Sequence, residues 1–416
     1  MARHVIIGNG PAGVVAAETL RHADSQAEIT LIGDEVEPPY SRMAIPYLLM
    51  GDISEAGTYL RKDADHFERL RIRLVHGRVD GIDPGAHSLS LADGRILPYD
   101  RLLIATGSHP VSPPIPGIDS PLVLACWTLA DARAIAARIA PGVRVLQMGA
   151  GFIGCIIMES LAARGPHLTV VEMGDRMVPR MLDEVAGTLI RRWCQGKGVR
   201  VLTGRRVVAI APVGQALEVR LDDGETLQVD ALINATGVKP NIAFLEGSGM
   251  AINTGVLVDE SMQTSIAGIY AAGDVAEALE FGTGRRVVNA IQPDAVEQAR
   301  TAALNMAGRQ AALPGTFVFN VLDTLGLISA SFGQWQGFAG CETAQLLDEA
   351  EYRYLRLVFS GDQLVGANSI GHTEHIGVLR GLIQGRVRLG AWKARLLANP
   401  LQISEAYLAR GLALAH

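Results

Sequence analysis

The sequence predicts an α/β fold with two parallel sheets. Two observations carry this prediction. A short apolar strand, a glycine-rich turn and a helix occur at the N-terminus, and the same succession returns near residue 150. Buried apolar runs that end in small residues supply further strands of the kind found in parallel sheets.

The first succession begins at the strand His4–Ile7, which leads directly into the turn Gly8-Asn9-Gly10-Pro11-Ala12-Gly13. An alanine-rich helix is expected over Val14–His22, and a second strand over Glu28–Ile32. A strand, a turn and a helix that lead back to a parallel strand form a βαβ unit. The N-terminal segment is therefore expected to build the first of the two sheets.

Each glycine of this turn has a physical task. Gly8 permits the tight turn, Gly10 lets a pyrophosphate approach the backbone, and Gly13 lets helix and strand pack closely. The free N–H groups of the helix N-terminus attract phosphate. Asp34 or Glu35, about twenty residues after the turn, is placed to hold ribose hydroxyls. Together these features indicate a Rossmann-like dinucleotide site.

The second succession runs from the strand Arg144–Met148 into Gly149-Ala150-Gly151-Phe152-Ile153-Gly154. A helix through Ala163 and a strand over Leu168–Val171 follow, and the strand closes on Glu172. A single turn of this kind is weak evidence, since it can be a packing turn alone. Two copies, each preceded by a strand and closed by an acid, predict two dinucleotide sites.

Three further strands end in small residues. The turns Ala105-Thr106-Gly107 and Ala235-Thr236-Gly237 follow two of them, and Gly273-Asp274 follows the third. Asp274 by itself fits a helix N-cap as well as a contact to a ribitol hydroxyl. Beside the first glycine turn, the ribitol contact is the favoured interpretation.

Composition excludes several classes of protein. Of 416 residues, 49% are hydrophobic and 19% charged, which favours folded domains over disorder. The net charge of −6 argues against nucleic-acid binding. Membrane insertion is not expected, and no signal peptide is expected, because Met1–His4 runs straight into a strand. We therefore expect a cytoplasmic protein.

The glycine turns and the strand ends resemble those of the FAD-dependent pyridine nucleotide–disulfide oxidoreductases. The resemblance implies an FAD domain over residues 1–118 and 242–320, an NAD(P) domain over 119–241 and a C-terminal α+β interface domain over 321–416. It also implies a homodimer. The residues implied for FAD are Gly8, Gly10, Pro11, Ala12, Gly13, Asp34, Glu35, Arg42, Val79, Ala105, Thr106, Gly107, Gly273, Asp274 and Gln292. Those implied for NAD are Gly149, Gly151, Phe152, Ile153, Gly154, Glu172, Ala235, Thr236 and Gly237.

Many members of this superfamily place a reactive cysteine beside the flavin, and this chain does not. Met43 stands at that place, in Met43-Ala44-Ile45-Pro46-Tyr47, and a thioether cannot form a thiolate. The four cysteines stand alone, which favours inert thiols. The chain is therefore most similar to the branch without redox cysteines, which contains rubredoxin and ferredoxin reductases and the flavin part of nitrite reductases. In that branch Pro46 and Tyr47 would lie near the flavin.

The resemblance implies an FAD-dependent NAD(P)H oxidoreductase that passes electrons to rubredoxin, to ferredoxin or to a partner subunit. Glu172 favours NADH over NADPH, because a carboxylate repels a 2′-phosphate. Arg176 could soften that preference or be a surface arginine.

Two alternative functions stay open. The flavin could act directly on oxygen, a quinone or a sulfur compound. The chain could also be a flavin-binding subunit or sensor, since Ile156 replaces a glutamate that relatives use for the nicotinamide.

The C-terminal segment Ile376–Ser404 carries five basic residues and no acid. Such a patch could dock an acidic electron carrier, or be a solvated helix face or a dimer surface. Its basic residues are Arg380, Arg386, Arg388, Lys393 and Arg395. His372 and His375 lie close to it in a loop, but no fourth ligand is evident, so no metal site is predicted.

Overall fold

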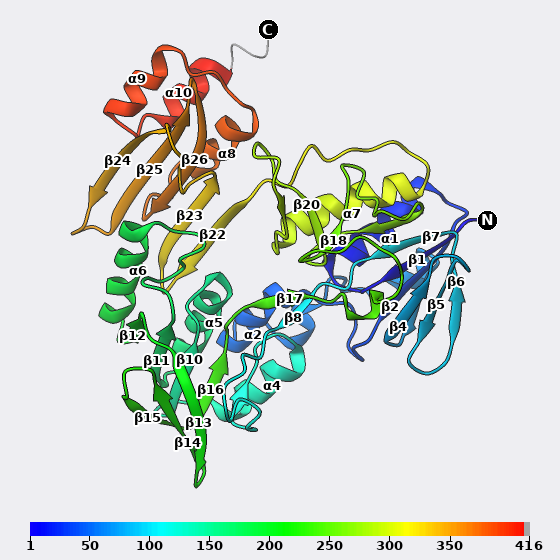
Figure 1. Ribbon diagram of the computed structural model, residues 1–416, viewed down its shortest axis with the longest axis horizontal. Coiled ribbons are helices and arrows are strands. Elements are labelled where there is room, and N and C mark those ends of the chain that lie inside the picture. Colours follow the sequence, from blue (N-terminus) through cyan, green and yellow to red (C-terminus); the bar gives the residue numbers. More distant parts are fainter. Residues whose placement is uncertain (412–416) are drawn as a thin grey trace. The chain divides into compact units, whose positions relative to one another are not determined.

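The computed structural model describes residues 1–411 and confirms the α/β fold class (Figure 1). Two compact units share the chain. The first comprises Met1–His109 and Val238–Phe317, and the second comprises Pro110–Gly237 and the chain from Val318 onward. The predicted three-domain boundaries near residues 118, 241 and 320 stay a prediction.

A five-stranded parallel sheet in the order β19-β7-β1-β2-β3 forms the centre of the first unit. Its strands are β1 (Arg3–Ile7), β2 (Glu28–Gly33), β3 (Ile72–His76), β7 (Arg101–Ile104) and β19 (Ile269–Ala271). Helices α1 (Pro11–Ala23) and α7 (Gln292–Met306) pack against each other in this unit. The sheet therefore joins strands from both ends of the unit's discontinuous chain.

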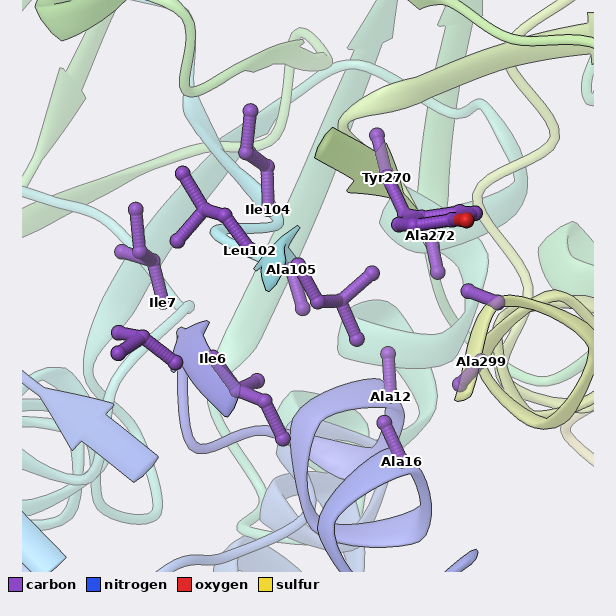
Figure 2. Close-up of a cluster of buried hydrophobic side chains, with 14 of the residues drawn as sticks. Ile6, Ile7, Ala12, Ala16, Leu102, Ile104, Ala105, Tyr270, Ala272 and Ala299 are labelled. Atoms are coloured by element: carbon purple, nitrogen blue, oxygen red, sulfur yellow. The ribbon is translucent and has the colours of Figure 1, made fainter. Parts of the chain in front are cut away.

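Figure 2 shows the core between this sheet and the two helices. Ile6, Leu102 and Ile104 on the strands are completely buried. Ala16 on α1 and Ala299 on α7 are also completely buried, and their small side chains let the helices approach closely. Central strands that are apolar on both faces are expected where helices or further layers cover a parallel sheet.

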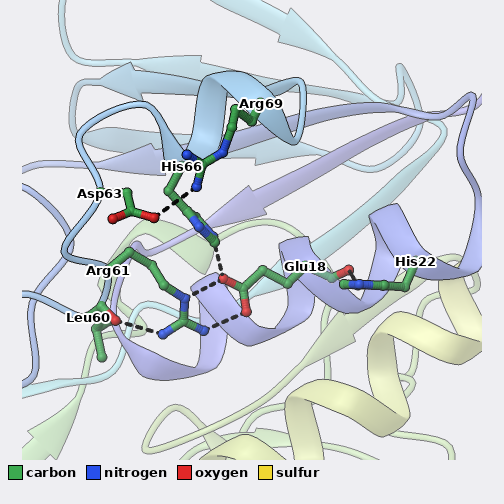
Figure 3. A network of polar contacts seen from close by, with 7 residues as sticks. All are labelled: Glu18, His22, Leu60, Arg61, Asp63, His66 and Arg69. Atoms are coloured by element: carbon green, nitrogen blue, oxygen red, sulfur yellow. Dashed lines mark hydrogen bonds and ion pairs between the residues drawn. The ribbon is translucent and has the colours of Figure 1, made fainter.

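Figure 3 shows a polar network that fixes the segment after α2 (Ile45–Met50) to α1. The Glu18 carboxylate accepts from Arg61 Nε and Nη2 at 2.6 and 2.5 Å and from His66 Nε2 at 2.8 Å. Arg61 also donates to the carbonyl oxygen of Leu60. Because all three charged side chains are less than one-third exposed, the network is a partly buried ion cluster.

Two small sheets, one antiparallel and one mixed, complete the first unit. One has the order β4-β5-β6 and the other the order β18-β20-β21, in which β20 and β21 are antiparallel and β18 and β20 parallel. Their bounds are β4 (Val79–Asp83), β5 (Ser88–Leu91), β6 (Ile96–Pro98), β18 (Val256–Leu257), β20 (Ala276–Leu279) and β21 (Arg286–Val287). The short helices are η1 (Arg42–Ala44), η2 (Glu55–Thr58), α3 (His66–Arg69) and η3 (Ala243–Leu245).

The second unit has its own five-stranded parallel sheet, in the order β12-β11-β10-β16-β9. Its strands are β9 (Val123–Leu124), β10 (Arg144–Met148), β11 (His167–Glu172), β12 (Arg200–Thr203) and β16 (Ala231–Asn234). The helices are α4 (Leu129–Arg138), α5 (Phe152–Ala162) and α6 (Glu184–Gly196). A capping box between Thr128 and Asp131 fixes the start of α4. An antiparallel sheet, β13 (Val207–Val213), β14 (Ala216–Leu221) and β15 (Thr226–Val229), is inserted before β16.

The C-terminal part of this unit is an antiparallel sheet with helices, which agrees with the predicted α+β segment. The sheet order is β22-β23-β26-β25-β24. Its elements are β22 (Phe319–Thr324), β23 (Leu327–Gly333), β24 (Glu342–Asp348), β25 (Arg353–Ser360), β26 (Gln363–Ile370), α8 (Ile376–Gln384), α9 (Ala391–Ala398) and α10 (Ile403–Gly411). Asp183, the N-cap of α6, accepts from the Tyr354 hydroxyl at 2.7 Å, so α6 and β25 are bonded directly.

The strands β8 (Ser108–Pro110) and β17 (Val238–Pro240) pair with each other where the chain passes between the units. Among the described residues, no helix combines the length and the apolar character needed to cross a bilayer.

Candidate functional site

The structure brings most of the predicted FAD residues to one edge of the first sheet. Because β1, β2, β7 and β19 run parallel, their carboxyl ends lie together. Gly8, Gly10, Pro11, Ala12 and Gly13 follow β1, Asp34 and Glu35 follow β2, Ala105, Thr106 and Gly107 follow β7, and Gly273 and Asp274 follow β19. This edge is the position at which open α/β sheets bind ligands.

The first glycine turn has the geometry of a phosphate cradle. Gly8 has φ +106°, and a Cβ there would lie 2.1 Å from the oxygen of Ala105. A Cβ on Gly10 would meet nothing within 4 Å, so this side of the turn is open. Gly10 is the N-cap of α1, no side chain caps the helix, and its first turn carries no acid. The free N–H groups of α1 are therefore available to an anion.

Asp274 lies at this edge with a partner that the sequence did not indicate. The Ser108 hydroxyl donates to Asp274 Oδ2 at 2.7 Å. Burial raises the pKa of Asp274, while the Ser108 hydrogen bond and the charge of Arg42 act in the opposite direction. Gly273 leaves room here, since a Cβ would only reach van der Waals contact with Ala295 and Ala12.

The two acids after β2 differ in their surroundings. Asp34 is exposed, whereas Glu35 is partly buried. The Tyr40 hydroxyl donates to Glu35 Oε2 and Arg42 Nη2 donates to Glu35 Oε1, both at 2.6 Å. Arg42 therefore neutralises Glu35 directly, which leaves Asp34 as the acid more open to a ligand.

The remaining predicted FAD residues lie on neighbouring loops. Gln292 is the first residue of α7 and accepts from the Ser41 hydroxyl at 2.7 Å, which joins the η1 loop to α7. Val79 begins β4, and its side chain is buried. In α2, Pro46 is buried and Tyr47 is 54% exposed. The side chain of Val79 is therefore covered by the protein, whereas the ring of Tyr47 is open to solvent.

The second glycine turn has nearly the same backbone angles as the first. Gly149 has φ +104°, against +106° at Gly8. The N-cap Gly151 has φ −73° and ψ −172°, against −72° and −172° at Gly10. As in the first turn, no side chain caps the helix, here α5, and a Cβ on Gly151 would meet nothing within 4 Å. Phe152, Ile153 and Gly154 form the first turn of α5.

Glu172, at the end of β11, is bonded to the backbone of this turn. Its Oε2 accepts from Ala150 N and its Oε1 from Gly174 N, both at 2.7 Å. Arg176 donates to the backbone oxygens of Leu182 and Pro179 and to Asp175. The guanidinium of Arg176 is thus part of the loop structure, and its side chain is partly buried rather than a solvated surface group.

The structure also locates two further features of the second site, the turn after β16 and Ile156. Ala235, Thr236 and Gly237 follow β16, beside β10 in the sheet. The Thr236 hydroxyl donates to Asn234 Oδ1 at 2.8 Å, so it stabilises its own turn. Ile156 is partly buried in α5.

No cysteine lies in the first unit, because all four occur between residues 110 and 237 or after 317. All four are free, and Cys126, Cys155 and Cys194 are buried. Burial raises the pKa of Cys126 and of Cys194 to about 12. These thiols are therefore inert as nucleophiles at neutral pH, as predicted.

With this geometry in place, comparison with known proteins identifies the family. The model of the pyridine nucleotide-disulphide oxidoreductases matches residues 2–303. The chain belongs to this family. The predicted membership is thus confirmed, and the chain is an FAD-dependent NADH oxidoreductase.

Relatives with curated names cover almost the whole chain. Subunit epsilon of the NADH-dependent phenylglyoxylate dehydrogenase of Aromatoleum evansii is 33% identical over 407 residues, 97% of this chain and 96% of that protein. The ferredoxin–NAD(+) reductase component of the anthranilate 1,2-dioxygenase system of Burkholderia cepacia is 34% identical over 391 residues, 91% and 93% of the two chains. In fold, the chain is similar to the solved covalent putidaredoxin reductase–putidaredoxin complex, with a TM-score of 0.91, 24% identity and 99% coverage of both chains.

Proposed function

We propose that this family member takes a hydride from NADH at the second glycine turn and passes electrons to a protein acceptor. FAD bound at the first turn would supply the conversion of a two-electron donor into single electrons. The observation that carries the proposal is the pair of matching glycine turns in a chain whose first unit has no cysteine. Without a thiol there, electrons cannot leave by disulfide exchange.

Each group of residues has a role in this proposal. Gly8, Gly10 and Gly13 with the N-terminus of α1 bind the FAD pyrophosphate, and Asp34 accepts from the adenosine ribose. Asp274, oriented by Ser108, accepts from a ribitol hydroxyl. Arg42 is paired with Glu35 and its charge also acts on Asp274, so it limits the negative charge that these two acids present to the cofactor.

At the second turn, Gly149, Gly151 and the first turn of α5 bind the pyrophosphate of NADH. Glu172 accepts from the adenosine ribose and disfavours a 2′-phosphate. Because Arg176 is bonded to Asp175 and to backbone oxygens, no compensating cation reaches that carboxylate from this loop. This supports NADH as the preferred donor over NADPH.

The acceptor follows from the nature of the relatives. One is a subunit of a larger dehydrogenase and another is the reductase component of a dioxygenase system. We propose a small iron–sulfur protein, ferredoxin or rubredoxin, or an iron–sulfur partner subunit as the acceptor. The basic C-terminal segment is its proposed docking surface.

The five basic residues of this segment have different surroundings in the structure. Arg380 lies over the Phe319 ring at 4.7 Å and donates to Gln384, and Arg395 lies over the Trp392 ring at 4.5 Å. Lys393 is paired with Glu342. Arg386 and Arg388 are exposed between α8 and α9, so we propose that they contribute most to docking.

The primary test is anaerobic mixing of the FAD-loaded protein with NADH while the flavin absorbance near 450 nm is followed. Rapid loss of absorbance is expected with NADH and slower loss with NADPH. The rate should be the same after treatment with iodoacetamide, because no accessible thiol takes part. No loss of absorbance with either nucleotide would refute the proposal.

A second test concerns the acceptor. The double variant R386E/R388E should reduce a [2Fe–2S] ferredoxin or rubredoxin about tenfold more slowly than the wild type at low salt, with ferricyanide reduction unchanged. R220E, a charge reversal at an exposed position on β14, is the matched control. Equal slowing of both acceptors, or of neither, would remove the docking proposal.

A further inference from the structure

The two glycine turns differ in one residue beneath them. Gln147 lies on β10 two residues before Gly149, and Ile6 has the equivalent place on β1 before Gly8. Both side chains have no exposed surface. A strand inside a parallel sheet is normally apolar at such a position, so the amide of Gln147 calls for an explanation.

The amide of Gln147 connects the first and last glycines of its turn. Its Nε2 donates to the backbone oxygens of Gly149 and Gly154, each at 2.8 Å. Because both partners are acceptors, only the NH₂ end of the amide can face them, which fixes the orientation of the side chain. Both N–H hydrogens of the amide are used in this way.

The distance between the first and the last glycine also differs between the two turns. A Cβ built on Gly13 would lie 1.8 Å from the oxygen of Gly8, whereas one on Gly154 would lie 2.5 Å from the oxygen of Gly149. The second turn is thus wider between its first and last glycine. Gln147 Nε2 lies 3.3 Å from that Cβ position. The side-chain amide therefore joins two backbone segments that in the first turn contact each other directly.

The NH₂ end of this amide makes two hydrogen bonds, but its other end carries a cost for the stability of the fold. Gln147 Oε1 is buried and has no hydrogen-bond partner, which destabilises the folded state. An apolar side chain of similar size, such as Ile6 in the first turn, fills the same position without that cost. The contribution of Gln147 must therefore lie in the geometry of the turn.

We propose that Gln147 is a positioning residue for NADH: it sets the width of the second glycine turn so that the N–H groups of Phe152 and Ile153 are aimed at the pyrophosphate. This inference rests on the proposed use of NADH at that turn. Glu172 and Val178 bond Ala150, the middle of the same loop, and Gly149 N donates to the backbone oxygen of Val171, whereas Gln147 holds the backbone oxygens of Gly149 and Gly154.

The test uses the FAD-loaded variants Q147L and Q147M, which keep the volume of the side chain and remove both donors. NAD⁺ binding is measured by calorimetry, NADH half-saturation by single-turnover flavin reduction, and stability by thermal unfolding. We expect the dissociation constant of NAD⁺ and the NADH half-saturation to rise about tenfold. The limiting rate of flavin reduction should be unchanged, and the melting temperature equal to or above that of the wild type.

I6L, the matched apolar exchange beneath the first turn, should leave NAD⁺ binding unchanged. Unchanged NAD⁺ binding in both Gln147 variants would overturn the inference, as would weaker binding accompanied by a lower melting temperature. If the wild-type protein binds NAD⁺ but NADH does not reduce its flavin, the proposed function alone is refuted. Calorimetry on the same variants would still decide the role of Gln147.

Discussion

The Ser108 hydroxyl donates to the Asp274 carboxylate over 2.7 Å, although 166 positions separate the two residues in the chain. Ser108 follows β7 and Asp274 follows β19, and these strands are neighbours in the sheet. The hydrogen bond orients Asp274, an acid whose pKa is raised by burial.

S108A should therefore weaken FAD binding. Loss of the hydroxyl removes one of the groups that stabilise the Asp274 carboxylate, so its pKa rises further and it accepts less well from a ligand hydroxyl. We expect the dissociation constant of FAD, measured by fluorescence titration of the apoprotein, to rise about tenfold. S90A is the control, because Ser90 donates to Asp80 on an exposed part of the same unit. Equal FAD affinity in S108A and S90A would contradict the assigned role.

E172A should reduce the preference for NADH. The variant loses the ribose acceptor and releases Ala150 N and Gly174 N, so NADH affinity should fall more than tenfold, or about 1.4 kcal/mol. NADPH affinity should change less, because a negative charge that repels its 2′-phosphate is also removed. Flavin reduction at varied concentrations of each nucleotide measures both. E184A is the control, at an exposed position in the same unit, and should leave the ratio of NADH to NADPH affinity unchanged. If E172A weakens the binding of both nucleotides by the same factor, Glu172 is not the selective residue.

Because of Asp294, the free energy of unfolding should decrease as the pH rises. It is buried in α7, accepts from Gln298 Nε2 at 2.9 Å, and burial, with Glu297 and Asp274 adding to it, raises its pKa to about 7. In the unfolded chain the pKa is about 3.9. The stabilisation is therefore complete below pH 4 and is lost as the pH rises through 7.

D294N keeps the neutral form at all pH values. Compared with the wild type, it should be similarly stable at pH 4 or below and more stable at pH 8, by an amount on the order of a few kcal/mol. Denaturant unfolding followed by circular dichroism at several pH values measures the difference. Parallel stability curves for the two proteins would show that Asp294 is ionised in the folded state near pH 5.

The ion cluster on α1 should stabilise the fold (Figure 3). E18Q leaves Arg61 and His66 without a charged acceptor, which we expect to cost about 1–3 kcal/mol in unfolding free energy. Because the folded-state pKa of Glu18 is lowered, its contribution is present at neutral pH and is lost as the pH falls below about 4. H22A is the control, since the His22 ring bonds the backbone oxygen of Glu18 rather than its carboxylate and is exposed. Similar stabilities of E18Q and H22A would contradict the expectation.

The sequence predicted the repeated units well, because local rules determine them. Strand Arg144–Met148 is observed as predicted, and the helix expected over Val14–His22 extends over Pro11–Ala23. Glycine spacing and apolar runs are short-range signals, so they locate turns and strand ends reliably.

The side-chain partners could not be predicted in the same way. Ser41 bonds Gln292, and Ser108 bonds Asp274, across long separations that no spacing rule covers. Gln147 could have been noticed as a polar residue inside an apolar strand, but its two backbone partners depend on the curvature of the turn. Such contacts become visible only when the sheet order is known.

The position of β19 has a consequence for synthesis of the protein. β19 pairs with β7, yet every strand of the second parallel sheet lies between them in the sequence. While the chain emerges from the ribosome, β7 therefore keeps an unpaired edge, which is a site for aggregation, until β19 has been made. The second sheet has all its strands once Asn234 has emerged. Translation of the first unit thus begins earlier, but its parallel sheet is completed after that of the second unit.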